Sequence, residues 1–212
     1  GLERYFSTNR PFWGWLFRLT VPVLGSQQPM AWQVFGLFWR WLSAVLLWKL
    51  LQRAWPRQVH LAAWAALLYV VFPPFRQQPV ALVYTPFFIV FSLFLCSQIL
   101  TQTAVGRYNR ETRSGRFWLL TLGALACSLY NLLAMEYFFV LELIRGLFIW
   151  DGLKDQAGTM WQRATRTLWI WLPYLALFGG VMVWRIFFFS YQTQNYSLIF
   201  LERLQNDAGS AL

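Results

Sequence analysis

Six apolar runs account for much of this chain, and short polar or basic segments separate them. The runs cover residues 30–51, 60–72, 80–102, 117–133, 137–150 and 168–189. An apolar helix of about 20 residues crosses the hydrocarbon core of a bilayer. The runs therefore predict an all-α fold, a polytopic transmembrane helical bundle with about six spans. We expect an integral, multi-pass membrane protein.

The amino-acid composition points to the same class. Hydrophobic residues make up 58% of the 212 residues and charged residues only 12%, whereas a soluble domain carries about 25% charged residues. A soluble domain of this length could not hide so much apolar surface in one core. The 14 Trp and 20 Phe also favour a membrane, because aromatic side chains gather where lipid meets water.

The basic charge predicts an orientation. One set of alternate connections between the runs holds Lys49, Arg53, Arg57, Arg107, Arg110, Arg113, Arg116, Lys154, Arg163 and Arg166; the opposite set holds Arg76 and Arg185. Cytoplasmic connections carry the excess of Lys and Arg, so the first set is predicted to be cytoplasmic. The net charge of +10 then reflects membrane orientation, and we expect no nucleic-acid partner because no basic, aromatic-interleaved soluble patch is present.

The ends of the chain differ from its middle. Residues 1–28 are predicted to be an outer-face interfacial segment, because Arg18 and Pro22 interrupt the aromatic stretch 11–24. Residues 29–190 form the bundle, and residues 191–212 are predicted to be an outer-face tail at the start of a missing C-terminal part. Since the sequence begins with Gly1 rather than Met, we expect it to be a piece of a longer protein.

Three ionisable residues near the fifth run are the first candidates for a site: Glu136, Glu142 and Arg145. An ionisable group at membrane depth costs about 2.5–3.5 kcal/mol, so it usually faces a partner or a cavity. Glu142 and Arg145 are three residues apart and can pair on one helix, as a structural or a functional intramembrane pair. Glu136 is a candidate metal ligand or base; the alternative is a solvated carboxylate at a helix start.

Three arginines are candidate phosphate contacts. Arg40 lies in the middle of the first run between Trp39 and Trp41, where it either stacks on an aromatic ring or reaches a phosphate. Arg10, before the aromatic stretch, and Arg76, in an outer connection, are placed to hold an anionic headgroup or simply to anchor the chain at the interface.

Other motifs are sparse. Cys96 and Cys127 both lie in apolar runs and His60 is the single histidine, so neither a disulfide framework nor a Cys/His metal spacing is predicted. The sequence contains no phosphate-cradling glycine loop, Cys-x-x-Cys pair or dinucleotide-binding fingerprint.

Three stretches resemble membrane-embedded glycosyltransferases of the GT-C type, in particular the bacterial relatives of the dolichyl-phosphate-mannose protein O-mannosyltransferases. The first is Asn9-Arg10-Pro11, which leads into an aromatic interfacial helix. The second is the helix, basic turn and helix of residues 31–72, which ends in Phe72-Pro73-Pro74. The third is the acidic and aromatic segment 136–145.

The resemblance implies an enzyme that transfers a sugar from a polyprenyl-phosphate donor to an acceptor on the outer face of a bacterial cytoplasmic membrane. It implies Glu136 as a catalytic or metal contact, with Mg²⁺ or Mn²⁺ as the ion, and Arg10, Arg40 and Arg76 as donor-phosphate contacts. Membrane lipid and the polyprenyl-phosphate donor are the expected partners. The chain departs from the family in one respect, because only Glu3 precedes the Arg-Pro pair, where the family has an acidic catalytic loop after an earlier span.

Two other functions remain open at the level of sequence. A transporter or flippase for a lipid-linked or anionic solute would use Glu142, Arg145 and Arg40 as an intramembrane relay. A non-catalytic membrane scaffold would use the same charges to hold helices together. Sugar transfer distinguishes the enzyme from both, and flux across vesicles distinguishes the transporter from the scaffold.

Overall fold

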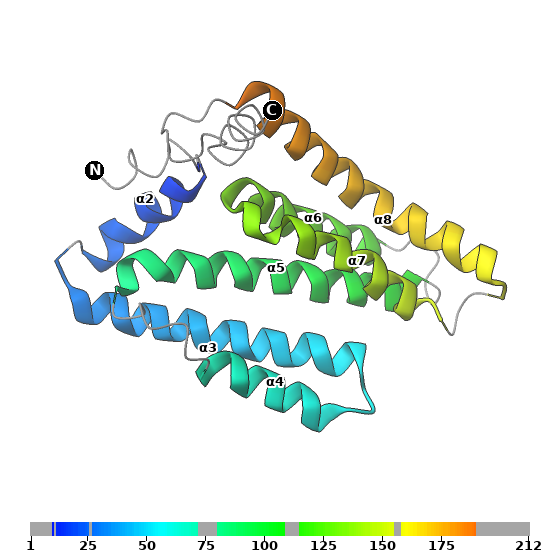
Figure 1. The fold of residues 1–212 in the computed structure, drawn as a ribbon, viewed down its shortest axis with the longest axis horizontal. Coiled ribbons are helices and arrows are strands. Elements are labelled where there is room, and N and C mark those ends of the chain that lie inside the picture. Colours follow the sequence, from blue (N-terminus) through cyan, green and yellow to red (C-terminus); the bar gives the residue numbers. More distant parts are fainter. Residues whose placement is uncertain are drawn as a thin grey trace, which may run out of the picture.

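The computed structural model describes residues 10, 12–25, 27–71, 80–108, 115–154 and 158–189. Of these residues 90% are helical and none forms a strand, which confirms the predicted all-α class (Figure 1). The elements are α2 (Trp13–Leu24), α3 (Pro29–Ala54), α4 (Val59–Val71), α5 (Ala81–Tyr108), α6 (Gly115–Ala134), the 3₁₀ turn η1 (Glu136–Phe138), α7 (Phe139–Gly152), α8 (Met160–Val183) and the π-helical turn η2 (Trp184–Phe188).

Four helices are long and apolar enough to cross a membrane: α3, α5, α6, and α8 together with η2. This agrees with an integral membrane protein. Two of the six predicted runs form shorter helices, since α4 has 13 residues and α7 has 14. At 1.5 Å per residue each is about 20 Å long, which is less than the hydrocarbon core of about 30 Å.

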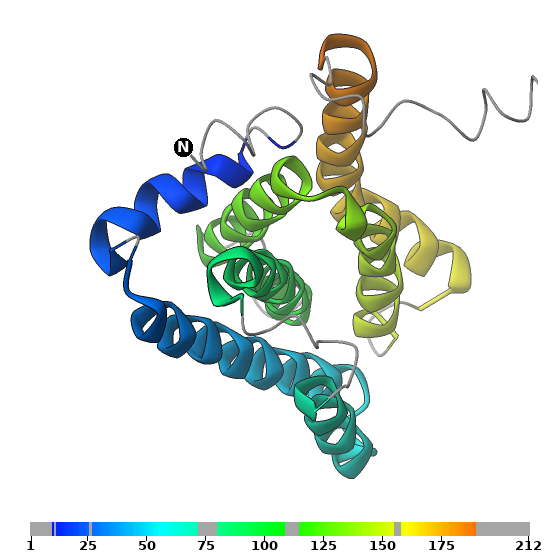
Figure 2. The same ribbon diagram turned by 60° about the vertical axis from the view of Figure 1, so that its left-hand side comes forward.

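Helix α5 lies at the centre of the bundle (Figure 2). In the most apolar stretch of α5, 56% is buried inside the protein, whereas the corresponding shares for α3 and α8 are 17% and 22%. Helix α3 packs against both α5 and α4, while α8 packs against α6 and α7. The central position explains why α5 also carries most of the buried Ser, Thr and Gln side chains.

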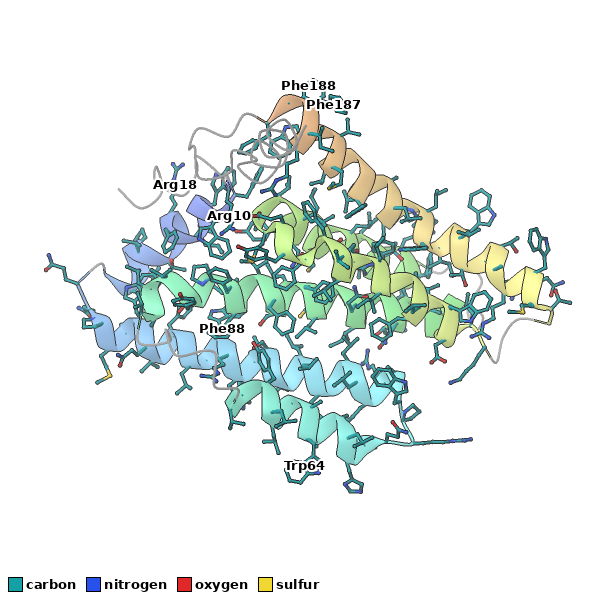
Figure 3. The ribbon with its side chains drawn as sticks, viewed as in Figure 1. Arg10, Arg18, Trp64, Phe88, Phe187 and Phe188 are labelled. Atoms are coloured by element: carbon teal, nitrogen blue, oxygen red, sulfur yellow. The ribbon has the colours of Figure 1, made fainter. Side chains whose placement is uncertain are left out.

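The perimeter of the bundle is apolar. Large side chains more than half exposed occur on most of the helices around it, for example Leu19, Leu37, Trp64, Leu119, Leu147 and Trp169. In Figure 3, Trp64 of α4 and Phe187 and Phe188 of η2 lie at the outside of the molecule, whereas Phe88 lies within it. So continuous an apolar perimeter is unusual for a soluble monomer, and it fits a surface solvated by lipid.

The segment predicted to be interfacial contains the helix α2. Its buried face packs Trp13, Leu16 and Phe17 against Ile89 and Val90 of α5. The helix ends at Gly25, which has a φ of 74°, and this left-handed backbone conformation favours glycine. The indole Nε1 of Trp32 donates to the Gly25 carbonyl at 2.8 Å, so the turn ties α2 to the start of α3.

The sixth predicted run begins too late. The sequence predicts its start at residue 168, but α8 begins at Met160, because a capping box precedes it. The Gln162 backbone N–H donates to Thr159 Oγ1 at 3.2 Å, and the Thr159 N–H donates to Gln162 Oε1 at 3.3 Å, which satisfies two donors at the start of the helix. Pro86 and Pro173 both lie inside continuous helices, α5 and α8.

Candidate functional site

The alternating directions of the helices bring several element ends together. Helix α2, the starts of α3, α5 and α7, the end of α6, and both η1 and η2 lie toward one end of the bundle (Figure 1). We call this the η1 end. Under the predicted orientation it faces the outside, and the opposite end, which carries the α3–α4 turn, faces the cytoplasm.

Glu136 stands at the η1 end between two arginines that are remote in sequence. Arg10 donates to Oε1 through Nη2 at 2.9 Å and through Nε at 3.3 Å. Arg185 donates through Nη2 to the other oxygen, Oε2, at 2.8 Å. These three side chains form the Arg10–Glu136–Arg185 cluster. It joins the segment before α2, the turn η1 and the turn η2 around one carboxylate.

Aromatic rings surround the cluster and leave part of it open. The Arg10 guanidinium lies 5.8 Å from the centre of the Trp13 ring and 5.3 Å from that of Tyr137, and Arg185 lies 5.6 Å from the centre of Phe139. The side chains of Arg10 and Glu136 are 14% and 25% exposed. Figure 3 places Arg10 beside the end of α6 and the start of α7, while Arg18 extends away from the bundle. The cluster is therefore partly desolvated but within reach of a ligand.

Two irregular turns position the cluster. Met135 is extended and buried between α6 and η1, so the chain leaves α6 and presents Glu136 in a single 3₁₀ turn. At the end of α8 the helix widens into the π-helical turn η2, in which Arg185 is buried while Phe187 and Phe188 are exposed. Such π-helical turns re-aim individual side chains and are frequent at functional sites.

The charges of the cluster keep Glu136 ionised. Burial by itself raises the pKa of the carboxyl, but the hydrogen bonds from Arg10, the local backbone hydrogen bond and the charges of Arg10 and Arg185 together lower the pKa below its ordinary value of 4.5. The three side chains carry two positive charges and one negative charge. The arrangement therefore suits Glu136 to hold the arginines, and it makes this carboxylate a weak proton acceptor.

The predicted phosphate contacts do not all meet at this cluster. Arg10 is part of it. Arg40 donates through Nη2 to the carbonyl of Val70, so this contact belongs to the packing of α3 against α4. Arg76 lies outside the described residues. Sequence reasoning did not select Arg185, although it stood out as one of the few cations on the predicted outer side.

The described residues contain no group of three or more His, Cys, Asp or Glu side chains that could hold a metal ion. Glu136 supplies one carboxylate, and both of its oxygens accept hydrogen bonds from arginine. A divalent ion at Glu136 stays a prediction that needs further oxygen ligands.

A second polar cluster lies inside the bundle and is closed. Arg145 is 0% exposed and donates through Nε to Glu142 Oε1 at 2.6 Å, so the structure pairs the two residues that sequence spacing selected. The guanidinium also donates to the Ser97 carbonyl at 3.3 Å, to Ser97 Oγ at 2.8 Å and to Thr101 Oγ1 at 2.5 Å. Its carbon lies 4.2 Å from the centre of the Tyr174 ring.

This buried network joins four helices. Ser97 and Thr101 come from α5 and Tyr174 from α8, and Ser128 of α6 donates to Glu142 Oε1 at 2.9 Å. Among the described residues, Glu142 Oε2 and the amide of Gln98 have no hydrogen-bond partner. The hydroxyl groups on α5 and α6 were not selected from the sequence, where they lie within apolar runs.

Comparison with protein-family models, with curated proteins and with solved structures gave no match to this chain. The fold and the two clusters are therefore the observations on which a function is argued.

Proposed function

We propose that this chain is the membrane core of a GT-C type glycosyltransferase, which transfers a sugar from a polyprenyl-phosphate-linked donor to an acceptor on the outer face of the membrane. The observation that carries the proposal is the Arg10–Glu136–Arg185 cluster. It joins Arg10 of the Asn-Arg-Pro stretch to Glu136 of the acidic segment, which are two of the three stretches on which the resemblance rests.

The chemistry of the cluster fits a lipid phosphate. Guanidinium groups bind phosphate oxygens through paired hydrogen bonds, and the cluster contains two of them. Both are partly desolvated by aromatic rings, and a lower local dielectric strengthens their interaction with an anion. An apolar perimeter adjoins the cluster at Tyr137 and Phe187, where the isoprenoid chain would lie in the bilayer.

In the proposed reaction Arg10 and Arg185 stabilise the phosphate that departs from the sugar. Glu136 holds the two guanidinium groups in place. The resemblance implies that the carboxylate which accepts the proton of the acceptor comes from an acidic outer loop upstream of Arg10. Arg40 and Arg76 remain predicted donor-phosphate contacts, and Mg²⁺ or Mn²⁺ remains a predicted cofactor.

The proposal includes six membrane crossings in the cytoplasmic membrane of a bacterium. Four helices are long enough to cross. The successive helices α3 to α8 alternate in direction (Figure 1), which supports α4 and α7 as the two further crossings. The turn η1 also adds three residues to the outer end of α7. A short helix can cross where the bilayer thins around it.

The test uses the full-length protein in membranes, supplied with a radiolabelled hexose on a polyprenyl phosphate. Arg185→Gln and Arg10→Gln are expected to lower transfer about 100-fold each, as expected for loss of one donor to a transition-state charge. Arg18→Gln removes an exposed cation from the same end of the bundle and is the matched control. Transfer that is unchanged in Arg185→Gln, or absent from the wild-type protein, would refute the proposal.

The contacts of the buried Glu142–Arg145 pair support a structural role for these two residues and not a role as a transport relay. Arg145 hydrogen-bonds to Glu142 on its own helix and to two side chains and a backbone carbonyl of α5, and both charged side chains are at most 3% exposed. A relay group has to exchange its partner during transport. Flux of a labelled polyprenyl-phosphate sugar across vesicles that is lost in a folded Arg145→Met variant is the result that would revive the transporter.

A further inference from the structure

Two adjoining clefts open at the end of the bundle opposite η1. One has a volume of about 290 Å³, lies between the ends of α3, α5 and α7, and is lined by Arg53, Gln102, Thr103 and Asp151 among others. The other has a volume of about 370 Å³, lies at the α3–α4 turn, and is lined by Trp55, Arg57, Gln58 and Lys154. They share Ala54 and Asp151, so we treat them as one Arg53–Lys154 cleft.

The cleft carries an excess of positive charge. Its lining includes three cations, Arg53, Arg57 and Lys154, and one carboxylate, Asp151. Arg53 is held in place, because its Nη1 donates to Thr103 Oγ1 at 2.7 Å and to the Ile99 carbonyl at 3.2 Å. A guanidinium carries five N–H donors, so Arg53 keeps further N–H groups that can bind an anion.

The one ion pair in the lining is loose. Lys154 Nζ lies 3.4 Å from Asp151 Oδ1, and both side chains are 48% exposed. Exposed pairs of this kind contribute little, so Lys154 can turn to an anion in the cleft at small cost. Arg57, on the α3–α4 turn, is exposed.

The surroundings indicate where such an anion comes from. The cleft lies at the ends of the bundle helices, where the polar region of a bilayer meets the protein, and Trp55 in its wall is 55% exposed, as is common for tryptophan at a membrane interface. At Gly106, also in the wall, a side-chain carbon would meet no heavy atom of the described residues within 4 Å. The positive charge of its connections predicts that this end of the bundle faces the cytoplasm. Anionic lipids of the cytoplasmic leaflet bind basic pockets.

We propose that the Arg53–Lys154 cleft binds the phosphate headgroup of an anionic phospholipid from the cytoplasmic leaflet. Arg53 contributes a fixed guanidinium, Arg57 and Lys154 close over the phosphate from the α3–α4 turn and the end of α7, and the acyl chains lie against the neighbouring helices. Asp151 weakens binding by its negative charge. This site is separate from the Arg10–Glu136–Arg185 cluster and does not depend on the function proposed for that cluster.

The experiment measures thermal unfolding of the purified full chain in detergent, with added phosphatidylglycerol, phosphatidylcholine or inorganic phosphate, and counts retained lipids by native mass spectrometry. Phosphatidylglycerol is expected to raise the unfolding midpoint and to be retained by the protein. Phosphatidylcholine is expected to do neither. Arg57→Gln and Lys154→Gln change exposed side chains and should each weaken retention of phosphatidylglycerol about five-fold. Asp151→Asn should strengthen it.

Arg116→Gln is the matched control, because Arg116 is an exposed cation at the start of α6, outside the lining of the cleft, on the same predicted side of the membrane. It should retain phosphatidylglycerol as the wild-type protein does. Equal losses in Arg116→Gln and Arg57→Gln would mean general attraction between the basic surface and anionic lipid, and would overturn the proposal. Inorganic phosphate that stabilises the protein as strongly as the lipid would assign the cleft to a soluble phosphate and would also overturn it.

Discussion

Arg145 donates through Nε to Oε1 of Glu142 at 2.6 Å, and the two side chains are 0% and 3% exposed. Two opposite charges buried this completely are stable only if their hydrogen-bonding capacity is used. Arg145 meets that condition through Ser97 and Thr101 of α5, and Glu142 meets part of it through Ser128 of α6. The pair thereby fixes α7 against two neighbouring helices.

We predict that Arg145→Met destabilises the protein by about 3–5 kcal/mol, because it leaves the Glu142 carboxylate buried without a counter-charge. Unfolding in a titration with a denaturing detergent measures the effect. The double variant Glu142→Leu with Arg145→Met removes both charges and should lose less stability than Arg145→Met alone. If the two variants lose equal stability, the charges do not interact in the folded protein.

The helices were predictable from the sequence because apolar runs are a local signal. The Glu142–Arg145 pair was equally accessible, since a spacing of three residues puts both side chains on one face of a helix. The start of α8 was wrong by eight residues because polar residues such as Gln162 and Arg163 interrupt the run, and it is the side-chain hydrogen bonds of Thr159 and Gln162 that begin the helix there.

The Arg10–Glu136–Arg185 cluster could not be assembled from the sequence. Its hydrogen-bonded residues lie 126 and 49 positions apart, and no local pattern specifies which arginine meets Glu136. The hydroxyl groups of Ser97 and Thr101 offered a usable signal, because a spacing of four residues places them on one face of a helix. Inside an apolar run their oxygens can accept hydrogen bonds from a buried donor, and Arg145 provides that donor.

Close packing of α3 on α5 gives a second prediction. A side-chain carbon added at Gly36 would lie 2.7 Å from Thr85 Oγ1, and Thr85 is buried and hydrogen-bonds to the Ala81 carbonyl at 2.6 Å. Gly36→Ala should therefore destabilise the protein by about 1–3 kcal/mol through overpacking. The measurement is again unfolding in a denaturing detergent.

Two further variants make the Gly36 test specific. Adding Thr85→Ala to Gly36→Ala removes the clashing hydroxyl and should recover part of the loss. Gly179→Ala in α8 is the control, because a side-chain carbon there meets none of the described residues within 4 Å. It should be neutral or stabilising by up to about 1 kcal/mol. An equal loss at both glycines would show that contact with Thr85 is not the cause.

The Glu136 carboxylate gives a pH dependence. Its pKa in the folded protein lies below the ordinary value of 4.5, so the unfolded chain binds this proton more readily than the folded one. The stabilisation is fully present above pH 4.5 and is lost as the pH falls through the folded-state pKa. Between pH 7 and pH 3 the unfolding midpoint of the wild-type protein should fall by more than that of Glu136→Gln. Parallel curves for the two proteins would contradict the ion pairing with Arg10 and Arg185.

The number of crossings is decided by the short helices, and labelling of single cysteines in intact cells tests it. In a background with Cys96 and Cys127 replaced by Ala, cysteines at the exposed residues Gln27 and Tyr137 should react with an impermeant maleimide. Cysteines at Gln58 and Gly158 should react only after the membrane is opened, because α3 and α7 carry the chain inward.

Val80, at the start of α5, is the discriminating position because α4 precedes it. If α4 crosses the membrane, a cysteine at Val80 reacts from outside like one at Gln27. A cysteine at Val80 that is protected like one at Gln58 would place the start of α5 on the inner side, and would contradict the alternating directions of the helices. The Arg-containing connection after α5 would in that case face outward, against the charge rule that orients the rest of the chain. Reaction at Val80 from the outside is the expected result, because it keeps the cations of three connections in the cytoplasm.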